Sequence, residues 1–135
     1  MAVVSVSMPE TLIEHLDAFV AANAYAGRSD LIREGTRTLL TEFDDEALSD
    51  RPLTGFVACQ YPFGSQRIDS ELAELRHEHG AIVTTTNHTH VADRCLEVFI
   101  VEGDLEAISL FIGQVRSIER LETVEYSLTP LDELE

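Results

Sequence analysis

The first 50 residues contain two different spacings of hydrophobic positions, one after the other. Val4, Val6 and Met8 recur at every second position, which predicts a strand over residues 2–8. Apolar residues then recur three and four positions apart, which predicts two helices on either side of a turn at residues 24–28. Ser29 is the expected N-cap of the second helix. The pattern therefore predicts the order strand, helix, turn, helix.

The rest of the chain alternates between strand and helix patterns. Residues 44–54 are polar and acidic around one proline, which predicts a linker between domain 1–50 and domain 51–135. The elements expected after it are a strand at 55–61, a helix at 68–78, strands at 81–91 and 95–101, a helix at 105–118 and a strand at 124–128. The order βαββαβ is that of the ferredoxin-like fold, so the expected class is α+β.

The N-terminal strand needs a partner, because a lone strand over two helices buries too little surface to be stable. Two copies related by a two-fold axis would pair their strands into a ribbon over four helices. Such a ribbon fits the major groove of DNA, where the outward Val3, Ser5 and Ser7 would contact base edges. Arg28 and the backbone amides at Ser29 would hold phosphate. The alternative is a ribbon that serves dimerisation alone.

Composition changes this picture in one respect, because the chain is strongly acidic. It has 25 acidic and 9 basic residues, all of them Arg, for a net charge of −16. Both halves are acidic and Lys is absent, which is typical of proteins from a high-salt cytoplasm. No apolar run reaches the length of a membrane span, and the N-terminus lacks a signal-peptide pattern. A cytoplasmic protein of a halophile is therefore expected.

Candidate chemistry is concentrated between residues 77 and 95. His88 and His90 lie two apart in a strand pattern, so both rings should project from one face, and a hairpin would bring Cys95 beside them. His77 ends the preceding helix, while His79 has no assigned role. Three imidazoles and one thiolate suit Zn(II) in a tetrahedron or Ni(II) or Cu(II) in a square plane. No nucleotide-binding or hydrolytic motif is present, so an enzyme is not expected.

Several motifs together resemble the nickel-responsive repressors of the NikR family. The turn and second helix carry Tyr25-x-x-Arg28-Ser29-Asp30-x-Ile32-Arg33. The second domain carries the eleven-residue step from His77 to His88, the pair His88-x-His90, then Cys95-Leu96-Glu97-Val98 and Glu102-Gly103-Asp104. The resemblance covers nearly the whole chain, and it is the combination that is specific.

This resemblance implies a homotetramer in which two ribbon-helix-helix dimers flank four ACT-type domains. It implies a nickel site made of His88, His90 and Cys95 of one subunit and His77 of the partner subunit. It also implies a potassium ion near carboxylates of the second helix, where Asp30 and Glu34 stand. A double-stranded DNA operator is the implied partner.

The chain departs from that family at two places. Four residues separate His90 from Cys95, one fewer than usual, and a one-residue change can turn a strand side chain to the opposite face. Val3 stands where the family has an outward Arg. The expected function is a nickel-responsive DNA-binding repressor. The alternatives are a regulator that senses copper, cobalt, zinc or a small molecule, and a metal-storage or chaperone protein.

Overall fold

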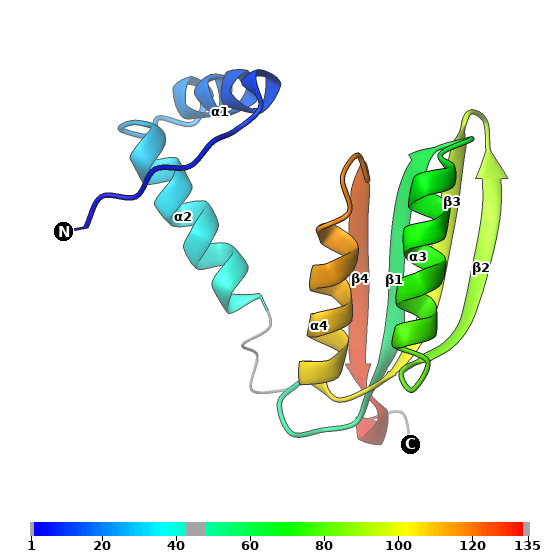
Figure 1. Cartoon of the computed structure of the whole chain (residues 1–135). Coiled ribbons are helices and arrows are strands. Elements are labelled where there is room, and N and C mark those ends of the chain that lie inside the picture. The colour runs from blue at the N-terminus through cyan, green and yellow to red at the C-terminus, as the bar shows by residue number, and fades with distance from the viewer. Residues whose placement is uncertain (1, 43–47, 134–135) are drawn as a thin grey trace. The chain divides into compact units, whose positions relative to one another are not determined.

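The computed structural model describes residues 2–42 and 48–133. The chain forms two compact units, Met1–Glu42 and Phe43–Glu135. Figure 1 shows the helices of the first unit and the sheet of the second. The division falls eight residues before the predicted boundary, and residues 44–47 of the predicted linker lie outside the described residues.

The N-terminal unit consists of two helices, α1 (Glu10–Ala22) and α2 (Arg28–Thr41), after an N-terminal segment with no helix or strand. Residues 2–8 thus form no ladder within this single chain, since backbone groups of a strand need a neighbouring strand to bond. The prediction of Ser29 as N-cap is wrong. The N-cap is Gly27, whose carbonyl accepts the first helical hydrogen bond from the Leu31 amide at 3.4 Å, so Ser29 lies inside the first turn.

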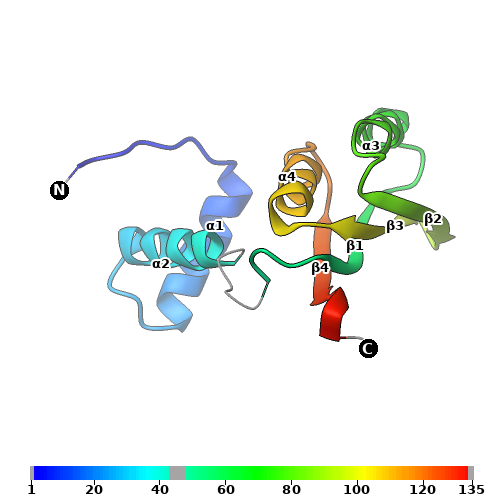
Figure 2. The same ribbon diagram turned by 90° about the horizontal axis from the view of Figure 1, so that it is seen from below.

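The C-terminal unit has the predicted order βαββαβ. Its elements are β1 (Leu53–Pro62), α3 (Gln66–Glu78), β2 (Val83–Val91), β3 (Arg94–Gly103), α4 (Leu105–Arg116) and β4 (Thr123–Pro130), followed by a short 3-10 turn, Leu131–Glu133. The four strands form one antiparallel sheet in the order β2-β3-β1-β4. Figure 2 shows α3 and α4 on the same face of this sheet. This confirms the α+β class and the arrangement expected for a ferredoxin-like fold.

The predicted linker extended too far into the sheet. Leu53 and Thr54 belong to β1, where Leu53 is fully buried and pairs with both Gly103 and Pro130. Pro52 directly precedes them, and proline is typical of a loop. The prediction therefore placed the first two residues of a central strand in the linker. The predicted start of β2 at residue 81 is two residues too early, because Ile82 lies in the turn before Val83.

The hydrophobic core lies between the sheet and its two helices. Alternate residues of β1 and β3 face the helices, and the predicted inward positions of α4 are all buried. The buried residues include Val57, Cys59, Tyr61, Phe99 and Val101 of the strands, Ile68 and Leu72 of α3, and Ile108, Phe111, Ile112 and Val115 of α4. Among the described residues, no helix combines the length and the apolar character needed to cross a membrane.

Candidate metal centre

The hairpin of β2 and β3 determines which side chains share a face. His90 pairs directly with Cys95, and His88 pairs directly with Glu97. Ala92 and Asp93 form the two-residue turn, and Ala92 takes the left-handed conformation at φ 57° that such tight turns need. Directly opposed residues of antiparallel strands project to the same face. The short interval therefore leaves Cys95 on the face of the two histidines.

The structure brings the side chains of His88, His90 and Cys95 together. One donor atom from each of them lies within 4.8 Å of the others. Two donors on one transition-metal ion lie at most about 4.1–4.4 Å apart, the sum of two bond lengths, so the three side chains must draw closer together to bind a single ion. Cys95 is only 1% exposed, whereas both histidines are exposed. Two imidazoles and a thiolate fit a soft or borderline metal such as nickel, and they do not fit magnesium or calcium.

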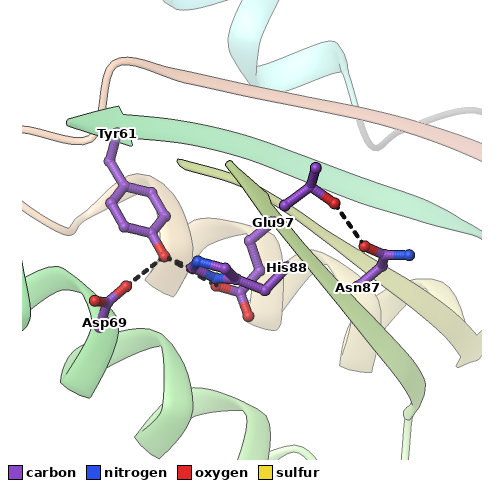
Figure 3. Close-up of polar contacts among 6 residues, drawn as sticks. Tyr61, Asp69, Asn87, His88 and Glu97 are labelled. Atoms are coloured by element: carbon purple, nitrogen blue, oxygen red, sulfur yellow. Dashed lines mark hydrogen bonds and ion pairs between the residues drawn. The ribbon is translucent and has the colours of Figure 1, made fainter. Parts of the chain in front are cut away.

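Tyr61 and Glu97 lie beside the His88 ring, and Asp69 lies beside the Tyr61 hydroxyl (Figure 3). The Tyr61 hydroxyl donates to Asp69 at 2.6 Å, and it also lies 3.1 Å from Glu97. The Nδ1 atom of His88 lies 3.2 Å from the same Glu97 oxygen. An ionised carboxylate only accepts hydrogen bonds, so this contact places the proton of a neutral His88 on Nδ1. The Nε2 atom is then free to bind a metal.

Burial and negative charge act on the protonation of this site. Burial raises the pKa of the Cys95 thiol, and the charges of Asp69 and Glu97 raise it further. Burial likewise raises the pKa of Tyr61, together with its hydrogen bond to Asp69. Cys95 is therefore a thiol at neutral pH in the metal-free protein, and a metal cation must displace its proton in order to bind.

The other two histidines of the region lie apart from this group. His77 is exposed near the end of α3, beside a hollow that Gly80 and Thr86 help to line. Within one chain it does not join the group of His88, His90 and Cys95. His79 contacts α4 instead. Its Nε2 atom lies 2.5 Å from Gln114 Oε1, and its ring meets the edge of Phe111 at 5.2 Å. His79 thus ties α3 to α4.

The predicted DNA-binding residues lie in the N-terminal unit and are exposed. Val3 is 94% exposed, and Ser5 and Ser7 are also exposed. Arg28 makes two hydrogen bonds of 2.8 Å to the Asp17 carboxylate, which links α2 to α1. This contact lowers the pKa of Asp17 through the hydrogen bond from Arg28. Ser29 is exposed in the first turn of α2.

The two carboxylates predicted to hold potassium have different surroundings. Asp30 accepts a hydrogen bond from Arg33 at 2.5 Å, which partly neutralises it. Glu34 lies one turn further along α2 and lines a shallow hollow with Phe19 and Tyr25. The cation prediction therefore stays a prediction.

Sequence reasoning missed Tyr61 and Glu97 as neighbours of His88, and Asp69 as the partner of Tyr61. The position of Glu97 follows from the hairpin register and could have been found by pairing the two strands outward from the turn. Tyr61 and Asp69 come from β1 and α3, and no local signal in the sequence relates them to the hairpin.

The fold and this group of side chains define a ferredoxin-like domain with a candidate transition-metal centre, joined to a two-helix unit. The family described as "NikR C terminal nickel binding domain" matches residues 54–129, which is more than half of the chain. The chain belongs to this family.

Similar full-length proteins carry matching names. A candidate nickel-responsive regulator of Halobacterium salinarum is 43% identical over 98% of this chain and 94% of its own length. Another, from Haloarcula marismortui, is 42% identical over 99% of this chain and 97% of its own. A third, from Methanopyrus kandleri, is 27% identical over 92% and 88%. An uncharacterized Thermotoga maritima protein of known structure has a TM-score of 0.49 and 13% identity, covering 59% of this chain and 98% of that one.

Proposed function

We propose that this chain is a nickel-responsive, DNA-binding transcriptional repressor. Ni(II) would bind His88, His90 and Cys95 of one subunit together with His77 of the partner subunit. The observation that carries the proposal is the convergence of two imidazoles and one buried thiol on the helix-facing side of the β2–β3 hairpin. The names of the relatives support nickel as the first metal to test.

The roles of the individual residues follow from their surroundings. Glu97 holds the ring of His88, while the rigid two-residue turn keeps His90 opposite Cys95. The three donors supply only part of a coordination sphere, and the exposed side of the two histidines leaves room for a further donor. His77 of the partner subunit would complete the set, so that nickel joins two subunits by coordination. Metal that bridges subunits favours the assembled state and, with it, one arrangement of the DNA-binding ends.

The N-terminal unit supports pairing of two copies. A groove between its N-terminal segment and helices is lined largely by apolar side chains, among them Val4, Val6, Met8, Ile13, Leu16 and Ile32. Val4 and Val6 are both strongly exposed in the single chain, which is costly for a soluble unit unless another surface covers them. A second copy that pairs along residues 2–8 would cover this groove and turn Val3, Ser5 and Ser7 outward to DNA. Two such dimers, joined by nickel between their C-terminal units, would form the proposed homotetramer.

The metal proposal is tested by an anaerobic Ni(II) titration in molar KCl, followed by absorption. We expect one Ni(II) per chain and a thiolate charge-transfer band in the wild type. Cys95→Ala should abolish the band, and His77→Ala should weaken binding. Cys59→Ala is the matched control, because Cys59 is a second buried thiol on the same face of the sheet that lies outside the group. A wild-type protein that binds nickel without this band would overturn the proposal and favour copper, cobalt, zinc or a small molecule.

The DNA proposal is tested by a mobility shift with the DNA upstream of the gene, with and without Ni(II). Molar KCl screens the net charge of −16, because the Debye length is then only about 3 Å. We expect binding in high salt and a loss of affinity in Ser7→Ala. Metal binding with no protected DNA site would instead indicate a storage or chaperone protein.

The cation proposal concerns the same N-terminal unit. If potassium binds near Asp30 and Glu34, replacing KCl by a salt of a larger monovalent cation should weaken DNA binding. Glu34→Gln should remove that difference between the two salts.

A further inference from the structure

Phe63 is an exposed aromatic residue that contacts a predicted metal ligand. Its ring centroid lies 4.6 Å from that of His90, and the two rings meet edge to face at 70°. The side chain is 60% exposed and lies outside the hydrophobic core. A phenyl ring so exposed contributes little by burial, so its place beside His90 is the contact that distinguishes it.

The backbone around Phe63 is constrained on both sides. Pro62 ends β1 with a fixed φ, and Gly64 follows at φ 89°, a conformation that residues with a side chain rarely adopt. The Phe63 amide donates to the carbonyl of Asp93 at 2.9 Å, which ties this turn to the turn of the β2–β3 hairpin. The phenyl ring is therefore presented to the hairpin from a rigid base.

The two histidines are held in different ways. Glu97 and Tyr61 lie within hydrogen-bonding reach of the His88 ring. Within the part of the chain that the structure describes, the ring of His90 instead has aromatic neighbours, Phe63 at 4.6 Å and the His88 ring at 5.3 Å. His90 also lies near the exposed end of the edge strand β2, so few neighbours surround its side chain among the described residues.

We infer that Phe63 is a positioning residue that orients the His90 imidazole toward Cys95 before metal arrives. The inference rests on the proposed metal-binding function. A ring held in its binding orientation loses less conformational freedom when the metal binds, so affinity rises without any contact between Phe63 and the ion. The interaction energy of an edge-to-face ring pair, converted to an equilibrium constant, limits this gain in affinity to roughly 10-fold.

The test compares Phe63→Leu, which keeps apolar bulk but removes the ring, with Phe63→Tyr, which keeps the ring. In the metal-free protein, the nuclear Overhauser contacts between the His90 ring and the Cys95 side chain should weaken in Phe63→Leu and stay near wild type in Phe63→Tyr. In a chelator competition, Phe63→Leu should bind Ni(II) roughly 2- to 10-fold more weakly, and Phe63→Tyr should recover wild-type affinity. Phe19→Leu is the control, since it removes an exposed ring that contacts Tyr25 in the other unit.

The outcomes separate this inference from the proposed function. If wild type and all variants bind nickel equally and the contacts between the His90 ring and Cys95 do not change, the role of Phe63 is refuted while the metal site stands. If the wild type binds no nickel through Cys95, the proposed function fails, and the NMR comparison still decides whether Phe63 orients His90. If Phe63→Tyr weakens binding as much as Phe63→Leu, the ring is not the cause and the inference is wrong.

Discussion

The two units of this protein differ in how far one chain can complete them. Among its described residues, the C-terminal unit has a closed core in which fifteen apolar side chains are buried between the sheet and its helices. Among the described residues of the N-terminal unit, no side chain is buried, and Val4, Val6, Leu12 and Phe19 are exposed. The difference shows that apolar side chains have two uses in this chain. In one unit it stabilises a single chain, and in the other it forms a surface that needs a partner.

The largest effect is expected from a cavity in the complete core. Phe111 is fully buried in α4 and contacts the ring of Phe99 edge to face. Phe111→Ala should destabilise the C-terminal unit by about 3–5 kcal/mol, as measured by hydrogen exchange of the β3 amides in urea. The matched change Leu40→Ala, at a side chain 74% exposed in α2, should alter stability by no more than about 0.5 kcal/mol. Equal effects in both units would contradict the contrast between them.

A charge in the apolar groove of the N-terminal unit should have the next largest effect. Val6→Asp would place a carboxylate in the surface that a second copy is proposed to cover, at a cost of about 2 kcal/mol or more. Hydrogen exchange of α1 and α2 should then become fast, and DNA binding should be lost.

Val3→Asp is the control for that experiment, because Val3 does not line the groove. It should weaken DNA binding while leaving exchange in α1 and α2 unchanged. Loss of protection in both variants would argue against the proposed two faces of the segment.

Alkaline pH should weaken the C-terminal unit through Cys59. Burial raises the pKa of this thiol to about 12 from an ordinary value of 9.0. Between these two values the unfolded chain loses the proton that the folded chain keeps, so stability falls as pH rises, by at most about 1.4 kcal/mol per pH unit. Cys59→Ala should reduce this slope in pH-dependent urea unfolding and leave the part due to Cys95 and Tyr61, whose pKa values are also raised by folding. Val57→Ala, at a buried neighbour that does not titrate, should lower stability and leave the slope as it is.

The smallest effect is expected at the pair of Arg28 and Asp17. Both side chains are about half exposed or more, and an exposed ion pair gains little from its charges. Arg28→Ala should change the stability of the N-terminal unit slightly at low salt and not measurably in molar KCl. A large loss of helix protection at high salt would show that this pair, rather than a covering partner, holds α1 and α2 together.

Most of the C-terminal fold could be predicted from local patterns. The alternation at Val57, Cys59 and Tyr61 and the helical spacing at Ile108, Phe111, Ile112 and Val115 each report one buried face, and all of these residues are buried. The errors lie at element ends. Leu53 was assigned to a linker and Ser29 to a cap, because residues at element ends carry weak periodic signals and their surroundings decide them.

The sequence by itself determined the order of elements, the positions that face the core and the residue types of the candidate metal site. These follow from short-range periodicity and from the few side chains able to bind a transition metal. Only the tertiary structure decided that Cys95 shares a face with His88 and His90, that Tyr61, bonded to Asp69, reaches His88 from another strand, and that Phe63 meets His90. The physical reason is that facing depends on strand register and turn geometry, which couple residues distant in sequence through hydrogen bonds that no local pattern records.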